Sequence, residues 1–522
     1  MNEKKALPIG FSNLKDLLTN NRLYVDKTLQ LYEVITRAPK YSLLTRPRRF
    51  GKSLIVSTLE EIFRGNKELF KNLWIGMHAD YEWRRYPVIR LDFSSMDTSC
   101  DRLLAKRLEE SIVDIADGYG IDVRARVDAA SKIEFLIKNV FVQGPVVILI
   151  DEYDYPLTAQ IGKPDQMEAN ASVMRAFYTA LKSLNEYIHF MFITGISKYP
   201  QESMFSGLNN VKDISFKPEY AGLTGYTDTE LRTNFDSYIQ EAADRQQRTP
   251  AEVIGTMQDW YNGYRFSSDL LTVYNPFSIL NYFYDKVFNN YWFLSGTPTF
   301  LVDILKTQKY TENEFNNVFS VPSSLVVLNQ SRPSLDVLLY QTGYVTIKSF
   351  VPHSNAYYLH YPNYEVRTSM NENLLSLMMD VELNAVNSLA VLLRHGLRTH
   401  DIALYMNAIK ALMANIPYEH HIKKESYYHS LLQVICNLLE LDMQSEVHVS
   451  NGRIDMVITV ADAVFIFELK CNQPVDAALR QIHERQYYQK FLLSGRSLFL
   501  VGVAFNFVSN KLVIEWASEE LG

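Results

Sequence analysis

The stretch Leu44-Thr-Arg-Pro-Arg-Arg-Phe-Gly-Lys-Ser53 decides the fold of the first part of this chain. It follows a short apolar run of strand type and precedes a segment whose apolar residues recur at helical spacing. A loop in this setting can bind phosphate. Gly51 allows close backbone approach, Lys52 can reach the β- and γ-phosphates, and the Ser53 hydroxyl can bind Mg²⁺. The stretch therefore predicts a nucleotide site.

The loop departs from the usual form G-x-x-x-x-G-K-[ST], because its first position is Arg46 and not glycine. Two further arginines, Arg48 and Arg49, lie inside it. They either point at the phosphates, in place of the geometry that the missing glycine provides, or face solvent or a partner subunit. No arginine finger can be assigned from the sequence.

Runs of buried-strand type recur in the first part of the chain, with helical patterns between them, at residues 41–45, 87–93, 145–150 and 189–194. This alternation predicts a parallel sheet with helices on both faces. Ligands of such sheets bind at the carboxyl ends of the strands, where the loop would lie. We expect an α/β P-loop NTPase domain over residues 1–224.

The partner that a phosphate loop requires is an acidic residue at the end of a neighbouring buried strand. Asp151 and Glu152 follow the run at 145–150, as in a Walker-B motif. We expect Asp151 to hold Mg²⁺ with Ser53, and Glu152 to polarise the attacking water; the alternative is a solvated loop start without catalysis. Thr194, at the end of the next strand, and Ser197 are candidate γ-phosphate sensors, although Thr194 could equally cap the following turn.

The pattern changes at about residue 225, and residues 225–410 are expected to form a helical lid or connector. It opens with a capping box, Thr227 with Glu230. Residues 340–347 and 356–362 could pair as a hairpin, the candidate wing of a winged helix. Residues 411–522 are expected to form a third domain, with a helix at 424–441, strands at 453–460 and 464–470, a helix at 477–493 and a strand at 497–503.

Two elements of the third domain predict metal-dependent phosphodiester cleavage. Glu468 and Lys470 project from one face of a strand. If the two strands pair through a turn at 461–463, Asp455 lies opposite about residue 469. Asp455 and Glu468 could then bind Mg²⁺, with Mn²⁺ as an alternative, while Lys470 orients the water or stabilises developing charge. The alternative is an amphipathic hairpin with charged edges.

Over nearly its full length the chain resembles the bacterial AAA-ATPase-like proteins that carry a C-terminal PD-(D/E)xK nuclease domain of α/β, restriction-endonuclease-like fold. Arginine at the first loop position is shared by that family, so the resemblance implies that Arg46 is a family feature. It supports the site reading for Asp455, Glu468 and Lys470. The motifs that carry it are Tyr24-Val-Asp-Lys-Thr28, Arg46-Pro-Arg-Arg-Phe-Gly-Lys-Ser53, Tyr86-Pro-Val-Ile89, Asp151-Glu-Tyr-Asp154, Phe205-Ser-Gly-Leu-Asn-Asn210, Tyr261-Asn-Gly-Tyr264 and Asn275-Pro-Phe-Ser278.

The resemblance also suggests roles for residues on the flanking helices. RecB-like members of the superfamily use a histidine as an additional metal ligand. His429 is the candidate here, with Glu425 as a weaker one, although most lone histidines are not ligands. Gln481 and Tyr487 are similar to a glutamine-to-tyrosine motif that helps to hold the site and the DNA. Their spacing departs from the RecB pattern, and packing of the helix explains Tyr487 equally well.

Composition limits the choice of partners. A formal net charge of −7 argues against a protein that coats nucleic acid non-specifically, so any such contact must be local. The three cysteines, Cys100, Cys436 and Cys471, form no C-x-x-C and suggest neither disulfides nor zinc. No apolar run approaches 18 residues and the first residues lack a signal-type core, so we expect a cytoplasmic protein without membrane contact.

The leading hypothesis is an ATP-binding and ATP-hydrolysing protein that controls a Mg²⁺-dependent DNA nuclease, with RNA as the alternative polymer. A second hypothesis is a nucleotide-dependent signalling switch whose terminal domain binds nucleic acid or protein without cleavage. A third is an interaction scaffold, which the absence of any nucleotide affinity would favour. A homo-oligomer is a further candidate partner, because active ATPases of this type often need an oligomeric state.

Overall fold

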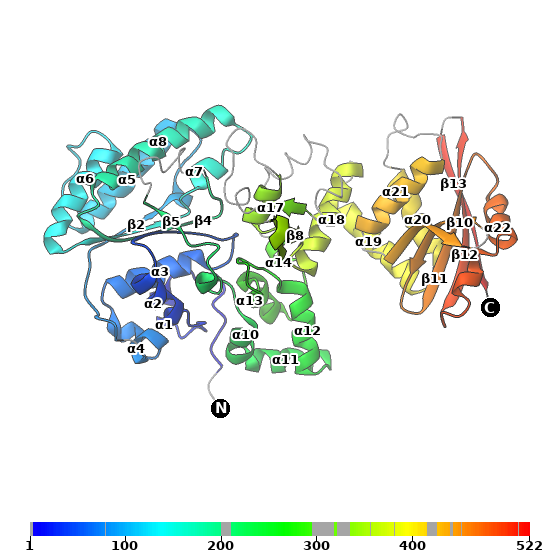
Figure 1. The fold of residues 1–522 in the computed structure, drawn as a ribbon, viewed down its shortest axis with the longest axis horizontal. Coiled ribbons are helices and arrows are strands. Elements are labelled where there is room, and N and C mark those ends of the chain that lie inside the picture. The colour runs from blue at the N-terminus through cyan, green and yellow to red at the C-terminus, as the bar shows by residue number, and fades with distance from the viewer. Residues whose placement is uncertain are drawn as a thin grey trace. The chain divides into compact units, whose positions relative to one another are not determined.

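The chain folds as two compact units (Figure 1): unit 1 is Met1–Ile304 with Asn313–Arg367, and unit 2 is Leu305–Glu312 with Thr368–Gly522. This division into two units does not test the predicted domain limits at 224/225 and 410/411, which remain predictions. In the described part of the chain, no helix combines the length and apolar character that crossing a bilayer requires. The computed structural model describes residues 4–78, 80–199, 210–294, 318–320, 335–354, 356–379, 382–414, 425–438, 442–449, 452–509 and 511–521.

The centre of unit 1 is a five-stranded parallel sheet in the order β2-β3-β4-β1-β5. β4 lies between β1 and β3, so the loop after β1 and the acidic pair after β3 reach the same edge of the sheet. The four predicted strand runs are confirmed, and the short β5 was not predicted. The strands are β1 (Tyr41–Thr45), β2 (Val88–Asp92), β3 (Val146–Asp151), β4 (Ile188–Gly195) and β5 (Lys212–Asp213).

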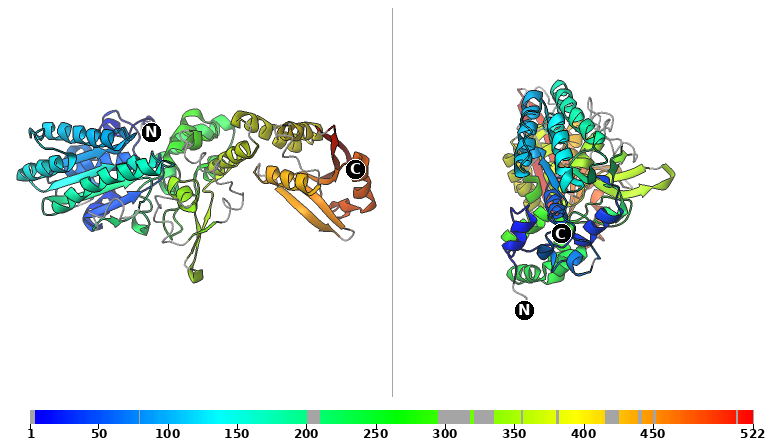
Figure 2. Two further views of the ribbon diagram at one scale, coloured as in Figure 1. Left: turned by 90° about the horizontal axis from the view of Figure 1, so that it is seen from above. Right: turned by 90° about the vertical axis from the view of Figure 1, so that its left-hand side faces the viewer.

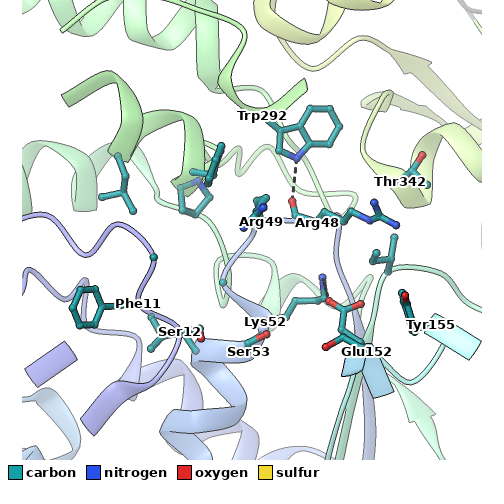
Figure 3. Close-up of a pocket in the computed structure, with 18 of the residues that line it drawn as sticks. Phe11, Ser12, Arg48, Arg49, Lys52, Ser53, Glu152, Tyr155, Trp292 and Thr342 are labelled. Atoms are coloured by element: carbon teal, nitrogen blue, oxygen red, sulfur yellow. Dashed lines mark hydrogen bonds and ion pairs between the residues drawn. The ribbon is translucent and has the colours of Figure 1, made fainter. Parts of the chain in front are cut away.

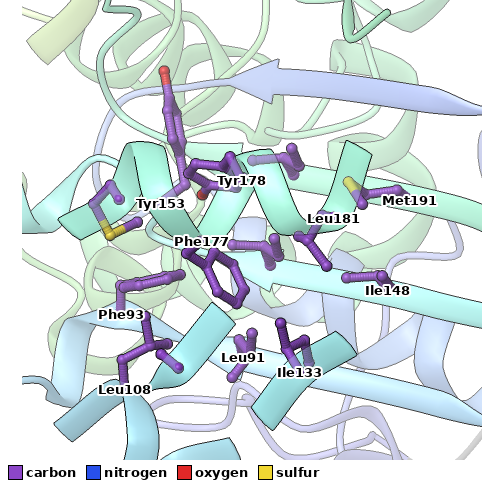
Figure 4. Close-up of a cluster of buried hydrophobic side chains, with 14 of the residues drawn as sticks. Leu91, Phe93, Leu108, Ile133, Ile148, Tyr153, Phe177, Tyr178, Leu181 and Met191 are labelled. Atoms are coloured by element: carbon purple, nitrogen blue, oxygen red, sulfur yellow. The ribbon is translucent and has the colours of Figure 1, made fainter. Parts of the chain in front are cut away.

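Helices cover both faces of this sheet, as predicted (Figure 1). Successive side chains of β1 alternate, so Leu43 packs into the core on one face and Leu44 into the core on the other. Figure 4 shows the first core, where Phe177 and Leu181 meet the sheet. That face carries α5 (Asp101–Gly118), α6 (Ala129–Val140), α7 (Tyr155–Thr158) and α8 (Pro164–Ser183), and the other α1 (Leu14–Thr19), α2 (Thr28–Arg37), α3 (Lys52–Phe63) and α4 (Trp74–Met77).

A helical subdomain follows the sheet and is held by its own aromatic core. The predicted capping box is confirmed, since Glu230 N–H donates to the Thr227 hydroxyl (3.2 Å) and Thr227 N–H to the Glu230 carboxylate (2.8 Å). Phe235 stacks on Phe283 in the core, with ring centroids 5.2 Å apart. The helices are α10 (Asp228–Asn234), α11 (Asp236–Gln246), α12 (Pro250–Tyr261), α13 (Pro276–Asp285) and α14 (Tyr291–Leu294).

Unit 1 also contains a small antiparallel sheet, β6-β8-β7, and α17 lies between β6 and β7 in the chain. The predicted hairpin forms, and Figure 2 shows it projecting from the rest of unit 1. The first predicted strand was placed too early, because residues up to Thr342 belong to α17, a helix buried along its length. The role of the hairpin as the wing of a winged helix stays a prediction. The elements are α17 (Leu335–Thr342), β6 (Val318–Ser320), β7 (Thr346–Val351) and β8 (Ala356–His360).

Unit 2 contains a mixed five-stranded sheet in the order β13-β12-β11-β10-β9, in which β11 and β12 are parallel. The two edge strands, β9 and β13, were not predicted. The strands are β9 (Asp442–Val449), β10 (Gly452–Thr459), β11 (Ala463–Cys471), β12 (Ser497–Val508) and β13 (Lys511–Leu521), and the helices are α18 (Tyr364–Met379), which begins in unit 1, α19 (Leu383–Arg398), α20 (Ile402–Met413), α21 (Glu425–Leu438) and α22 (Val475–Glu484).

Two local predictions for unit 2 are corrected. The helix expected at 477–493 ends at Glu484, because Gln486 adopts a left-handed backbone (φ 51°) and the chain continues as a short 3-10 helix, η8 (Tyr487–Phe491). Met456 pairs with Phe467, one residue away from the predicted register. Residues 205–209, 424 and 439–441, on which other predictions fall, lie outside the described residues.

Candidate functional sites

The phosphate loop requires an unusual backbone at two positions. Arg49 (φ 66°) and Gly51 (φ 85°) both adopt the left-handed conformation, and α3 begins at Lys52. A Cβ atom at Gly51 would meet nothing within 4 Å, so glycine suits this position through its conformational freedom and not through lack of space. The turn directs the first N–H groups of α3 and the side chains of Lys52 and Ser53 toward one region, which is the arrangement of an anion site at a helix N-terminus.

Arg46 occupies the position of the missing glycine, but its side chain is a structural one. It is 2% exposed, and its guanidinium donates to the carbonyls of Thr45 (2.8 Å), Ser215 (2.9 Å) and Tyr220 (3.1 Å). The guanidinium carbon also lies 4.3 Å from the centre of the Phe266 ring. Burial lowers the pKa of Arg46 to about 10, so the group stays charged at neutral pH. Arg46 therefore joins β1 to the segment after β5 and does not face the nucleotide cavity.

The acidic pair at the end of β3 lies beside the loop. Asp151 is the last residue of this strand and is fully buried, and burial raises the pKa of its carboxyl group, an effect that the neighbouring Ser53 hydroxyl partly offsets. Lys52 Nζ lies 3.2 Å from the Glu152 carboxylate (Figure 3). It also donates to the Pro47 carbonyl at 3.2 Å. Glu152 has a left-handed backbone (φ 49°).

Asp151 is suited to a metal ion by an observation of its own. Its Oδ1 atom accepts the Glu152 N–H at 3.0 Å, whereas its buried Oδ2 atom has no hydrogen-bond partner among the described residues. A buried carboxylate oxygen without a partner is costly unless a ligand compensates it. A hard carboxylate oxygen beside the Ser53 hydroxyl matches the ligands that Mg²⁺ prefers.

The two sensor candidates differ in position. Thr194 is fully buried opposite Leu44 and does not line the cavity, whereas Ser197 does. Asp154 belongs to the motif Asp151-Glu-Tyr-Asp154, but no role was predicted for it. Its carboxylate accepts hydrogen bonds from the N–H groups of Ile196 (3.1 Å) and Ser197 (2.6 Å). Burial, followed by the charge of Glu152, raises the pKa of Asp154 to about 7. Asp154 thus shapes the cavity wall beside Ser197.

A cavity of about 710 Å³ lies within unit 1, and Lys52, Ser53, Glu152 and Ser197 line it (Figure 3). Its polar wall includes both exposed arginines of the loop, and Arg49 lies 4.8 Å from the Phe277 ring centre. Other lining residues were not predicted for this site, because they come from distant parts of the chain, although Pro276 and Phe277 lie in a motif quoted for the family: Pro8, Ile9, Gly10, Phe11, Ser12, Tyr226, Pro276, Phe277, Leu280, Trp292, Thr342 and Tyr344. The space suits a nucleotide, with phosphates at the loop and the base against apolar side chains.

The nuclease-type residues of unit 2 also lie together. Glu468 and Lys470 are 1% and 8% exposed, and Lys470 Nζ donates to the Glu468 carboxylate at 2.8 Å and to the Leu469 carbonyl at 3.0 Å. Asp455, on β10, accepts the Leu469 N–H at 2.8 Å. The observed register, continued by one residue, places Asp455 beside Glu468 and not opposite residue 469.

The His429 side chain, on α21, contacts this site, but it contacts the backbone of Asp455 and not a metal-binding carboxylate. Its Nε2 atom lies 2.8 Å from the carbonyl oxygen of Asp455, so this nitrogen donates and is engaged there. The side chain of Glu425 lies outside the described part of the structure. In the described residues, no group of three or more His, Cys, Asp or Glu side chains is arranged to hold a metal. The two carboxylates and the Leu469 carbonyl are nevertheless hard oxygen donors, and their chemistry fits Mg²⁺ or Mn²⁺.

A groove of about 560 Å³ adjoins Lys470. Gln481 donates to the Tyr487 hydroxyl at 3.2 Å, so the two residues of the glutamine-to-tyrosine motif contact each other in its wall. Among the described residues, Glu484 is the one carboxylate that lines the groove, against four cationic side chains. These are Arg453, Lys470, Arg480 and Arg485. The excess of positive charge is the local feature that a polyanion requires in a protein of net charge −7.

These features define a protein with a P-loop NTPase sheet and a terminal domain built on a mixed sheet. Two family models match it: "Predicted AAA-ATPase" over residues 8–205 and "PD-(D/E)XK nuclease superfamily" over residues 423–516. An "Uncharacterized protein in vnfD 5'region" of Azotobacter chroococcum mcd 1 is 32% identical over 538 residues, which cover 99% of this chain and 100% of that protein. The chain belongs to the AAA-ATPase-like proteins with a C-terminal PD-(D/E)XK nuclease superfamily domain.

One solved structure with likeness is that of the Aeropyrum pernix ORC1 protein in complex with DNA. It is 12% identical, and the match covers 67% of this chain and 90% of that one, with a TM-score of 0.23. The superposition is loose. The assignment of the fold therefore rests on the sheet order and the phosphate loop of unit 1.

Proposed function

We propose that unit 1 binds ATP with Mg²⁺ and hydrolyses it, and that unit 2 cleaves DNA under the control of the nucleotide. The observation that carries the first part is the meeting of Lys52 and Ser53, at the start of α3, with the buried Asp151, one of whose oxygens has no partner in the described structure. The groove of cationic side chains beside Lys470 supports the second part.

In the ATPase site each residue has a chemical task. The N–H groups of the first turn of α3 and the Lys52 ammonium bind phosphate oxygens, and Arg48 and Arg49 add positive charge at the cavity wall. Glu152 accepts a hydrogen bond from the attacking water and orients it. A Mg²⁺ ion held by Ser53 and Asp151 would neutralise charge on the transferred phosphoryl group.

In the nuclease site Lys470 is held between two acceptors, which keeps its ammonium beside Glu468. There it can orient the attacking water and stabilise the negative charge that develops on the phosphate. A metal ion held by Asp455 and Glu468 would polarise the phosphodiester. The cationic groove beside Lys470 binds the neighbouring phosphates of the strand.

Parallel assays on one preparation test the ATPase proposal. Phosphate release from ATP and Mg²⁺ should fall to background in Lys52→Ala. It should stay near wild type in Lys71→Ala, which makes the same chemical change at an exposed position of the same unit. Equal hydrolysis by both variants would contradict the assignment.

The same preparation tests the nuclease. Cleavage of duplex and single-stranded DNA with Mg²⁺ or Mn²⁺ should be lost in Asp455→Asn and Lys470→Ala but kept in Lys511→Ala, an exposed control in unit 2. Adding ATP should change the cleavage rate of the wild type and not that of Lys52→Ala. Retained DNA binding with no cleavage by the wild type would support the signalling switch instead.

A further inference from the structure

Trp292 joins the phosphate loop to a buried carboxylate. Its indole N–H donates to the carbonyl oxygen of Arg48 at 3.0 Å, the bond drawn in Figure 3, and its backbone N–H donates to Glu365 at 2.6 Å. Trp292 is 6% exposed and its ring packs on Tyr344, with centroids 5.3 Å apart. The backbone bond to Glu365 is buried, where the N–H has no water as an alternative acceptor, and the indole bond to Arg48 is partly buried in the wall of the cavity.

Glu365 is anchored on its other side. It is fully buried in the first turn of α18, and its second carboxylate oxygen accepts the Ser278 hydroxyl at 2.8 Å. Ser278 lies in the first turn of α13, whose N-cap Asn275 accepts the N–H groups of Phe277 (2.9 Å) and Ser278 (3.2 Å). The motif Asn275-Pro-Phe-Ser278 thus has a structural task, because it fixes the hydroxyl that holds Glu365.

The motif Tyr261-Asn-Gly-Tyr264 holds the same region. A Cβ atom at Gly263 (φ 93°) would come within 1.9 Å of the Pro362 carbonyl oxygen, and the Asn363 amide donates to the Asn262 carbonyl at 2.8 Å. The Tyr264 ring meets Phe50, in the phosphate loop, edge to face at a centroid distance of 4.7 Å. The loop and the residues just before α18 therefore pack against one short segment.

We propose that Trp292 and Glu365 are positioning residues that tie the phosphate loop to the first turn of α18, so that nucleotide bound at the loop stabilises that turn. α18 begins in unit 1, and its residues from Thr368 onward belong to unit 2. A conformational change in the loop would therefore alter the stability of the first turn of α18, and this helix continues into unit 2. The nucleotide part of this inference rests on the proposed ATP site, whereas the tie itself does not.

The tie predicts a defect in the protein without nucleotide. Glu365→Ala removes both acceptors, and amide hydrogen exchange of residues 46–51 should accelerate about twofold to tenfold, the range expected for one lost hydrogen bond. Glu365→Gln keeps a carbonyl oxygen for Trp292 and an amide for Ser278, so its exchange should match wild type. Met257→Ala, which would leave a cavity in the core of the helical subdomain, controls for general destabilisation. Loop exchange in Glu365→Ala that equals wild type or the Met257 control overturns the tie.

The second arm measures the response to nucleotide. ATP with Mg²⁺ should slow exchange of residues 362–367 in the wild type and in Glu365→Gln, but not in Glu365→Ala. Trp292→Phe, which keeps the ring and removes the indole N–H, should also lose this response. ATP that binds in a titration yet leaves residues 362–367 unchanged in the wild type overturns the coupling. If ATP does not bind at all, the proposed function fails, and the first arm alone still decides the tie.

Discussion

The cationic groove of unit 2 makes a quantitative prediction about salt. Arg480 and Arg485 are exposed side chains that line it beside Lys470. Each phosphate contact contributes about 0.9 to the slope of log affinity against log salt for duplex DNA and about 0.7 for a single strand. Replacing both arginines by alanine should therefore reduce the slope by about 1.8 or about 1.4, respectively.

The corresponding change in affinity is large enough to measure. Between 50 and 200 mM salt, a slope difference of about 1.8 means that the defect of the double variant shrinks by about twelvefold. Fluorescence anisotropy of labelled DNA in the presence of EDTA measures binding without cleavage. The matched control, Arg496→Ala with Lys511→Ala, removes the same charge at exposed positions outside the groove. An unchanged slope in the groove variant, or an equal fall in the control, would refute the reasoning.

Three further predictions concern unit 1. Glu152→Gln should bind ATP normally but hydrolyse it about 100-fold more slowly, and a matching loss in a nucleotide titration would contradict its role with water. Burial raises the pKa of Glu365 to about 8, so its stabilising contribution is complete below pH 4.5 and is lost as the pH rises toward 8. Glu365→Gln should remove this dependence, at most about 1.4 kcal/mol per pH unit, and identical urea titrations of both proteins at pH 5.5 and 8 would argue against it. Arg46→Met should lower the free energy of unfolding by about 3 kcal/mol, because it leaves buried carbonyls unpaired. Arg48→Ala should weaken ATP binding without lowering the free energy of unfolding. The opposite pattern would contradict the roles given to the two arginines.

The structural elements that could be predicted are those whose conformation depends on residues close together in the chain. The strand, loop and helix around Gly51 follow from local apolar patterning and the chemistry of one glycine, and the structure has them where they were expected. The pairing of β10 with β11 was expected, but its register was one residue off. Thr459 pairs with Val464, so the connecting loop is one residue longer than the turn that was assumed. The edge strands β9 and β13 were missed because their polar residues give only a weak apolar alternation.

The sequence by itself determined the class of the two domains and indicated Lys52, Ser53, Asp151, Glu468 and Lys470 as candidate site residues. These motifs are short, and their spacing along a strand or loop is enough to define which groups can meet. Only the tertiary structure decided how the rest of the chain serves the sites. Residues far apart in the sequence converge on the cavity, the arginine at the glycine position turns away from it, and a buried carboxylate receives the tryptophan that holds the loop. Such contacts depend on packing between distant segments, and the local pattern of residues carries no record of that packing.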